Sequence, residues 1–348
     1  MSNRARVLFV DDEQRVLNSM RAMFRREFEL FLTTDGATAV KIAAANEIDV
    51  IVADQRMPGM SGVEVLDMVK RLSPKTMRIL LTGYADPAAI EGSINVGEVF
   101  RFLSKPCPPK QLRETIRLAV QAARAVGAPD VPYLQTEQRP ASGRQDWAAS
   151  GDEAAFIELP ILQTQGTNGR GDGVQRARDV GVVVYTMDSV FAETALRTLS
   201  GERNTMLATS LVKTMQALET TSSGVLITDI TTDFARLDRI VGALKQQVPE
   251  LVTIVVSDTR DSSNMISLIN HGQVFRYELK PVTPGKLRID INEAAIKHVT
   301  LRNNPGLEKR HSVERLPLQT YSGSHAHDFG AVADLSARRA RNQYLIAG

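Results

Sequence analysis

The sequence predicts an α/β protein with two doubly wound parallel sheets in tandem, joined by a flexible linker. Short apolar stretches alternate with segments of helical periodicity, which is typical of a parallel sheet covered by helices on both faces. Sliding the chain along itself by 175 residues superposes its second half on its first. A segment rich in Gly, Pro, Ser, Gln and Asp separates the repeats. We therefore expect domains at 4–126 and 180–300, a linker at 127–179 and a mostly disordered tail at 301–348.

Four strands are expected in the first repeat, and each is followed by a polar side chain. The apolar stretches are 6–10, 50–53, 79–81 and 99–102. Beyond them, in the same order, come Asp11 with Asp12, Asp54, Thr82 and Lys105. The carboxyl ends of parallel strands meet at one edge of a sheet, where ligands gather. We therefore expect three acids, one hydroxyl and one amine to converge on a single site.

The expected cluster favours a magnesium ion and phosphoryl chemistry. Three carboxylates within a few ångströms repel each other by about 3 kcal/mol per pair at an effective dielectric constant near 20. They therefore require protonation or a cation, and oxygen ligands of this kind suit Mg²⁺. A carboxylate beside the metal can attack a phosphoryl group and form an aspartyl phosphate, while a lysine and a hydroxyl hold the phosphoryl oxygens. The sequence thus predicts a phosphate-operated switch.

Each part of this cluster also has a simpler interpretation. Asp11 and Asp12 precede a helix and could cap its N-terminus. Asp54 precedes the turn-forming segment 57–62 and could only begin a turn. Lys105, before Pro106, could be a solvated lysine. The order and spacing of all the parts together favour the functional interpretation.

Residues 4–126 resemble the receiver domain of bacterial two-component response regulators, which has a flavodoxin-like (βα)5 fold. The resemblance rests on four motifs, namely Val10–Glu13, Asp54–Gly62, Leu81–Gly83 and Phe102–Pro106. The stretches Asp54–Ser61 and Leu81–Asp86 are also similar to those of receivers joined to HD-GYP phosphodiesterase domains. No such output domain is recognisable in this sequence.

The resemblance implies a phosphoacceptor and a metal site. Asp54 would accept phosphate from a histidine kinase or a histidine phosphotransfer protein. Asp12 and Asp54 would bind Mg²⁺ together with the backbone carbonyl of Arg56, and Asp11 would act on the metal through water.

The resemblance also implies how phosphate is held and sensed. Thr82 and Lys105 would grip the phosphoryl group, and Phe102 would swing inward when Thr82 moves. The face formed by the fourth helix, fifth strand and fifth helix would then rearrange. The Lys105–Pro106 bond is a candidate for the cis form, and we expect Arg56 and Tyr84 to tune the lifetime of the phosphate.

The second repeat keeps the spacing of the site but not its paired acids. The shift places Asp229 on Asp54, Ser257 on Thr82 and Lys280 on Lys105, whereas Thr186 and Met187 stand where Asp11 and Asp12 are. The nearest acid, Asp188, lies opposite Glu13. Without the paired acids a metal loses most of its charge complement. We therefore expect a degenerate receiver used for docking or dimerisation, with phosphorylation through an altered metal site, or Asp229 as a plain helix cap, as alternatives.

We predict a response regulator that signals through contacts with a downstream protein or with itself, and that is not an enzyme with a separate catalytic domain. One alternative is a phosphorylation-independent scaffold. Another is a phosphate sink or relay intermediate that returns phosphate to a histidine domain. The cognate kinase and the downstream target are not encoded in any motif we recognise.

Composition agrees with two ordinary domains and argues against several classes of partner. The 348 residues are 43% hydrophobic and carry 42 basic and 40 acidic side chains, so the formal charge of +2 gives no case for nucleic acid. The single cysteine, Cys107, excludes a disulfide framework within the chain. No apolar stretch approaches the roughly 18 residues of a membrane span, and no apolar leader is visible. We expect a cytoplasmic protein without a membrane partner.

Two segments outside the repeats carry apolar side chains. Within the linker, 154–162 could dock on a receiver face or remain disordered. In the tail, 329–346 has a weak apolar stripe that Arg339 interrupts, so we expect disorder there rather than a partner-binding helix.

Overall fold

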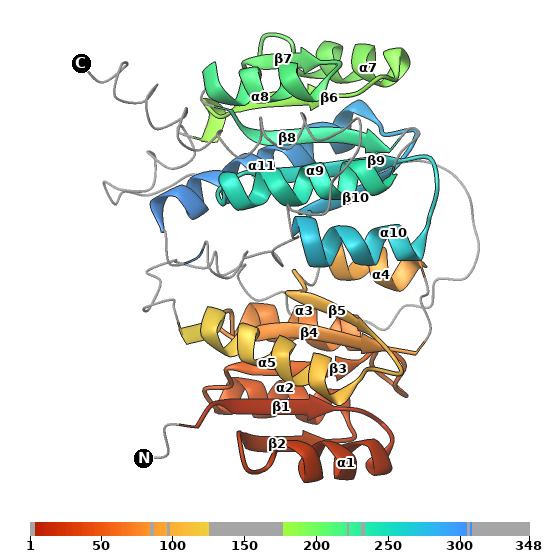
Figure 1. Ribbon diagram of the computed structural model, residues 1–348, viewed down its shortest axis with the longest axis vertical. Helices are drawn as coiled ribbons and strands as arrows, with labels where there is room; N and C mark the ends of the chain where they lie inside the picture. The colour runs from red at the N-terminus through yellow and green to blue at the C-terminus, as the bar shows by residue number, and fades with distance from the viewer. Residues whose placement is uncertain are drawn as a thin grey trace, which may run out of the picture.

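The computed structural model describes residues 4–83, 87–95, 98–124, 177–220, 223–230, 234–304 and 307. They form two five-stranded parallel sheets with helices on both faces (Figure 1). The predicted α/β class is confirmed, and both sheets are consistent with the flavodoxin-like receiver fold. Segment 154–162, Tyr84 and the tail beyond residue 307 lie outside the described residues.

The first sheet has the strand order β2-β1-β3-β4-β5. Its elements are β1 (Arg6–Val10), α1 (Gln14–Phe24), β2 (Glu29–Thr33), α2 (Gly36–Ala45), β3 (Val50–Asp54), α3 (Gly62–Leu72), β4 (Met77–Thr82), α4 (Pro87–Asn95), β5 (Arg101–Ser104) and α5 (Pro109–Arg124). The order reverses between β1 and β3, which is the point where ligands bind in doubly wound sheets.

Four strands differ from the sequence prediction. β3 ends one residue later than expected, at Asp54, and β4 spans Met77–Thr82 rather than 79–81. β5 begins at Arg101, two residues later than expected, because Glu98 has a positive φ of 44° and only Arg101–Ser104 pair with β4. β2 was not predicted. All of its side chains are partly exposed, as befits an edge strand, so it lacks the buried apolar run that identifies the central strands.

Side chains that alternate along the strands of the first sheet point to its two opposite faces, and an apolar layer covers each face. α2, α3 and α4 cover one face through residues such as Val40, Leu66 and Ile90. α1 and α5 cover the other through Phe24 and Ile116. β1, β3 and β4 therefore have a fully packed environment on both sides, which explains their continuous Val, Ile and Leu content.

The second sheet has the order β10-β9-β8-β6-β7. Its elements are β6 (Gly181–Tyr185), α7 (Ser189–Leu199), β7 (Thr205–Ala208), α8 (Leu211–Thr220), β8 (Ser223–Ile230), α9 (Phe234–Gln247), β9 (Val252–Ser257), α10 (Ser262–Ser267), the π-helix η1 (Leu268–Gly272), β10 (Arg276–Leu279) and α11 (Pro284–Asn303). At the shift of 175 residues, β6, β9 and β10 coincide with β1, β4 and β5. The repeat found in the sequence is thus a repeat of structure.

The two halves are arranged so that β5 and β10, each an edge strand of its sheet, lie towards each other (Figure 1). α4 packs against α10 and β10, and β5 contacts η1. One apolar cluster runs through both halves and includes Ile94 from the first and Ile269 from the second. Among the described helices, none has the length and apolar character that crossing a membrane requires.

Candidate functional site

The polar residues that follow the strands of the first sheet gather at its carboxyl edge. Asp54 is the last residue of β3 and Thr82 the last of β4. Backbone hydrogen bonds continue beyond the strands, since Gln55 N donates to Leu81 O at 3.0 Å and Lys105 N donates to Thr82 O at 2.6 Å. These backbone hydrogen bonds therefore fix the position of the Lys105 backbone relative to that of Asp54.

Lys105 joins two buried carboxylates. Its Nζ lies 2.8 Å from Asp11 Oδ2 and 2.5 Å from Asp54 Oδ1. The second oxygen of each acid accepts from a backbone N–H, at 2.8 Å from Arg56 N to Asp54 and at 3.0 Å from Glu13 N to Asp11. Asp11 and Asp54 are 4% and 6% exposed. The structure thus brings together three of the residues that the sequence placed at this site.

Burial and charge act in opposite directions on this cluster. Burial raises the pKa of the Asp54 carboxyl above its ordinary value, the Lys105 ammonium partly offsets this, and the Asp11 carboxylate adds to it. For Lys105, burial alone would lower the pKa, but its hydrogen bonds to Asp11 and Asp54 prevail and the pKa lies above its ordinary value. Lys105 is therefore a firmly protonated cation at neutral pH, and Asp54 is an acid whose ionised form is costly.

The remaining predicted residues have different surroundings. Thr82 and Phe102 are buried, with 3% and 1% of their surfaces exposed. Asp12 is exposed to solvent, although it directly follows Asp11. The Lys105–Pro106 bond is cis, as the resemblance led us to expect.

The capping alternative for Asp11 and Asp12 is wrong, because neither residue is the N-cap of α1. Glu13 is the N-cap residue of α1 and makes no side-chain capping bond. Asp11 instead accepts from the Glu13 amide just before the helix. One carboxylate oxygen of Asp11 therefore accepts from the Glu13 backbone N–H, and the other contacts the Lys105 ammonium.

The buried carboxylates offer oxygen donors of the kind that Mg²⁺ prefers. Within the part of the chain that the structure describes, however, no group of three or more Asp, Glu, His or Cys side chains surrounds a common metal position. Asp11 and Asp54 contact the Lys105 ammonium, and Asp12 faces solvent. The oxygen donors of Asp11 and Asp54 fit Mg²⁺, and the third acid, Asp12, is exposed to solvent.

Gly62 lets the loop after Asp54 close tightly on β3. A Cβ atom at this position would lie 2.3 Å from the Asp54 carbonyl oxygen and 2.8 Å from Leu80 Cδ1. Ser61 and Glu64 form a capping box that begins α3 at this glycine. The loop that carries Arg56 is therefore held at both ends.

The second half has a lysine-centred cluster at the equivalent edge. Lys280 Nζ lies 2.7 Å from Asp188 Oδ2, 3.0 Å from Asp229 Oδ2 and 3.6 Å from Asp258 Oδ2. The hydrogen bond from Lys280 lowers the pKa of Asp188. Asp229 thus contacts Lys280 as Asp54 contacts Lys105. Its alternative role as a helix cap involved Asp233, which lies outside the described residues.

Two residues divide the role that Asp11 has in the first half. Thr186 Oγ1 accepts from Asp188 N at 2.9 Å, as Asp11 accepts from Glu13 N. Asp188 supplies the carboxylate for Lys280 and also caps α7. Sequence reasoning noted Asp188 as the nearest acid but gave it no role. Ser257 is buried and donates to Thr259 O at 3.0 Å, while Met187 is 69% exposed.

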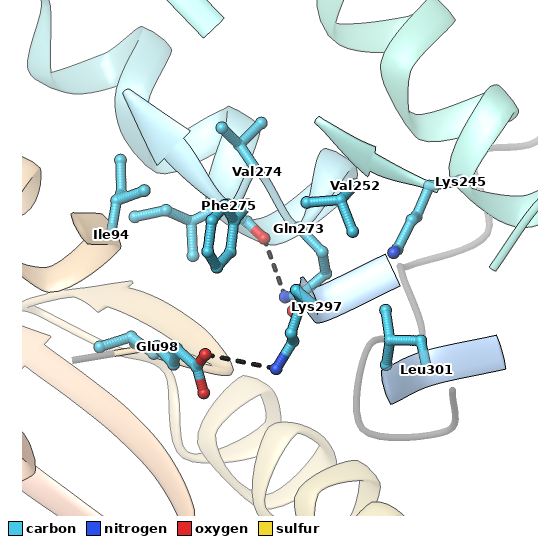
Figure 2. A pocket seen from close by; sticks show the side chains of 11 residues that line it. Ile94, Glu98, Lys245, Val252, Gln273, Val274, Phe275, Lys297 and Leu301 are labelled. Carbon is cyan, nitrogen blue, oxygen red and sulfur yellow. Dashed lines mark hydrogen bonds and ion pairs between the residues drawn. The ribbon is translucent and has the colours of Figure 1, made fainter. Parts of the chain in front are cut away.

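A small pocket lies between the two halves, away from Asp54 (Figure 2). Its walls include Ile94 and Glu98 from the first half and Phe275 and Lys297 from the second. Its volume of about 40 Å³ is room for only a few water molecules. We interpret it as a packing gap in the interface rather than as a ligand site.

Comparison with known proteins identifies the first half. Residues 7–117 match the family described as the response regulator receiver domain. The N-terminal part of the chain is therefore a response regulator receiver domain, the fold and family that its motifs resemble.

Three relatives illustrate the extent of the similarity. Hydrogenase transcriptional regulatory protein HoxA of Bradyrhizobium diazoefficiens is 35% identical over 124 residues, covering 36% of this chain and 26% of that protein. Sporulation initiation phosphotransferase F of Bacillus subtilis is 26% identical over 113 residues, covering 32% of this chain and 90% of that protein. The signal receiver domain of an HD domain-containing protein from Pseudomonas fluorescens Pf-5 has 29% identity and a TM-score of 0.35, covering 36% of this chain and 93% of that one. The match thus spans about a quarter of the length of HoxA.

Proposed function

We propose that this chain is a response regulator of a two-component phosphorelay that accepts phosphate on Asp54. The donor is a histidine kinase or a histidine phosphotransfer protein, and the output is a protein contact. The observation that carries the proposal is the buried Asp54 carboxylate, held 2.5 Å from Lys105 beside Asp11 at the carboxyl edge of a receiver-type sheet.

Each residue of the first site has a chemical task in this proposal. Asp54 attacks the phosphorus atom, the bond to the donor histidine nitrogen breaks, and the phosphoryl group remains on the carboxylate. Lys105 and Thr82 then hold phosphoryl oxygens. Asp12, Asp54 and the carbonyl of Arg56 would bind Mg²⁺, with Asp11 acting through water, and the ion would supply positive charge for the incoming phosphoryl group.

Phe102 and Thr82 form the proposed switch. Thr82 ends β4 and pairs with Ser104, and Phe102 lies two residues before Ser104 on the same strand, so a phosphoryl group that recruits Thr82 would change the packing around Phe102. In the second half we propose a degenerate receiver, because Thr186 and Met187 replace the paired acids and Lys280 is already surrounded by Asp188, Asp229 and Asp258. We place the protein in the cytoplasm, where such kinases deliver phosphate.

The direct test is the intact mass of the full chain after incubation with a small acyl phosphate and Mg²⁺. We expect one added phosphate in the wild type and in Asp229→Ala, and none in Asp54→Ala. An adduct that is lost in Asp229→Ala would overturn the assignment of the second half. No adduct in the wild type would overturn the proposed function.

A scaffold that works without phosphate is the second candidate. The extensive contact between the halves favours it, because a chain with a fixed internal interface can present a surface without a switch. Partners captured equally by wild type and Asp54→Ala would support this candidate.

A relay intermediate is the third candidate, and the similarity to the relative named sporulation initiation phosphotransferase F supports it. Phosphate that returns from Asp54 to a histidine phosphotransfer domain faster than it hydrolyses would favour the relay.

A further inference from the structure

The two halves are joined by a matched pair of asparagines. Asn95, the last residue of α4, accepts from Tyr277 N at 3.0 Å and donates to Tyr277 O at 3.0 Å. Asn270, in η1, accepts from Phe102 N at 3.0 Å and donates to Phe102 O at 2.9 Å. The shift of 175 residues carries Asn95 onto Asn270 and Phe102 onto Tyr277. Each half therefore makes the same contact with the other, and we name these four residues the asparagine clasp.

The clasp closes two open sheet edges. β5 and β10 are each the last strand of a sheet, and such strands present unpaired N–H and C=O groups. A primary amide has a donor and an acceptor side by side, so it can pair with both groups of one strand residue. Asn270 thus stands in for a neighbouring strand at Phe102, and Asn95 does so at Tyr277. Separating the halves would break all four hydrogen bonds together.

Other contacts surround the clasp. Phe102 belongs to one apolar cluster with Ile269 and Tyr277 of the second half. Gln273 Nε2 donates to Phe100 O at 2.8 Å. Lys297 Nζ lies 3.3 Å from Glu98 Oε1, as Figure 2 shows across the pocket.

We propose that residues 181–303 are the built-in partner of the α4–β5 face, and that docking of this partner and phosphorylation of Asp54 stabilise each other through β5. The proposal rests on the proposed function, since a phosphoryl group on Asp54 is one of the two coupled states. It names the occupant of the switched face as the second half of the same chain.

The coupling follows from the position of Phe102. Its backbone is held by Asn270, and its side chain is only 1% exposed. Three residues further along the chain, Lys105 contacts Asp54. Docking therefore holds β5 with Phe102 buried, which is the arrangement the proposed switch requires when Thr82 moves towards phosphate. If docking favours the phosphorylated arrangement, phosphorylation must favour docking by the same factor.

The test is hydrogen exchange of the full chain, read at single amides, before and after treatment with acetyl phosphate and Mg²⁺. The Phe102 and Tyr277 amides report directly on the clasp, because each donates to an asparagine of the other half. The variants are Asn95→Ala with Asn270→Ala, and Asp54→Ala. Asn18→Ala, an exposed asparagine on α1, is the matched control. Intact mass is recorded on every sample.

In the unphosphorylated chain, we expect the double variant to exchange about tenfold or more faster at Phe102 and Tyr277, and Asn18→Ala to exchange as the wild type does. Phosphorylation should slow exchange at both amides by about fivefold or more, with no change in Asp54→Ala. The double variant should also reach a lower phosphorylated fraction than the control.

An adduct on Asp54 with unchanged or faster exchange at Phe102 and Tyr277 would overturn the coupling while leaving the proposed function intact. The absence of any adduct in the wild type would overturn the proposed function itself. Amides of β3 and β8 show whether the double variant is folded. If they lose protection as well, Asn270→Asp replaces it, because a carboxylate cannot donate to Phe102 O yet keeps the size of the side chain.

Discussion

Lys105 is the residue on which the first site depends. It contacts both Asp11 and Asp54, and its positive charge offsets part of the cost of burying them. In the absence of other cations it holds the two carboxylates at one point. In the proposed function, the same ammonium would bind one oxygen of the phosphoryl group.

Replacing Lys105 with Met should raise the pKa of Asp54 further. The variant keeps the length of the side chain but removes the cation that opposes the effect of burial on Asp54. Carbon-detected NMR titration of the Asp54 carboxyl measures the change. Lys110→Met, at an exposed position, should leave that pKa unaltered. A pKa of Asp54 that falls in Lys105→Met would contradict the role given to Lys105.

Asp54→Asn should raise the free energy of unfolding at neutral pH. Burial raises the pKa of Asp54 in the folded chain, so folding favours the protonated form. That contribution to stability is complete below the pKa of the unfolded chain and is lost as the pH rises through the folded pKa. The neutral amide of the variant does not ionise, so the variant does not lose this stability as the pH rises. The difference in free energy of unfolding between the variant and the wild type should therefore vanish in acid. Urea unfolding at neutral pH and at acid pH measures the free energy of unfolding of the variant and of the wild type. Equal differences at both pH values would argue against a raised pKa.

In the second half, Asp229 and Asp258 provide a matched pair. The Asp229 side chain is 1% exposed and lies 3.0 Å from Lys280, whereas that of Asp258 is 63% exposed and lies 3.6 Å away. Asp229→Ala leaves a buried ammonium with less charge compensation, so we expect a loss of about 3 kcal/mol or more in the free energy of unfolding. Asp258→Ala should cost less than about 1 kcal/mol. Chemical denaturation would measure both, and equal losses would argue against a buried ion pair.

At the scale of elements, the loop between β3 and α3 positions Asp54, the proposed phosphoacceptor. Gly62 lies so close to the Asp54 carbonyl that no side chain fits. Gly62→Ala should therefore displace the loop, with a loss of about 1 to 3 kcal/mol in the free energy of unfolding and slower phosphorylation of Asp54. Gly285→Ala has open space around its Cβ position at the start of α11 and should be neutral or slightly stabilising. Thermal unfolding and intact mass would test both variants, and an unperturbed Gly62→Ala would contradict the close approach.

The elements also show what could be predicted from sequence. β1, β3 and β4 are buried on both faces, so their apolar runs locate them directly. β2 escaped notice because its side chains are only partly buried. The grouping of Asp11, Asp54 and Lys105 could be predicted because each directly follows, or ends, a strand at the carboxyl edge of the first sheet.

The asparagine clasp was missed because a single asparagine on a helix, such as Asn95 on α4 or Asn270 in η1, leaves no local sequence pattern that shows which strand it will bind. The repeat does align Asn95 with Asn270, so the pair was present in the alignment without a reason to single it out. The division of the role of Asp11 between Thr186 and Asp188 depends on hydrogen bonds that spacing does not reveal.

At the scale of the whole molecule, the chain joins a receiver domain to a second half whose parallel sheet repeats the strand order of the first. The first half carries two buried acids and one lysine at its site, and the second keeps the lysine with differently placed acids. The last strands of the two sheets lie towards each other and are closed by equivalent asparagines. Under the proposed function, phosphorylation of the first half would be transmitted to the second half across this interface.

The interface should hold the halves together without a covalent link. A protease recognition sequence inserted near residue 145 allows the chain to be cut after it has folded. We expect the two fragments to elute together in size-exclusion chromatography, because the clasp, the apolar cluster and the Lys297–Glu98 pair remain. The same cut in the Asn95→Ala, Asn270→Ala chain should release more of each fragment. Complete separation of the wild-type fragments would contradict a stable interface.

The central claim is that phosphate is carried on Asp54 and on no other residue. Borohydride reduction of the phosphorylated full chain converts an aspartyl phosphate to homoserine, and peptide mass spectrometry then locates it. The account predicts homoserine at position 54 alone, in an amount that matches the phosphate seen in the intact mass. Homoserine at position 229, or phosphate that resists reduction because it sits on a hydroxyl, would contradict it.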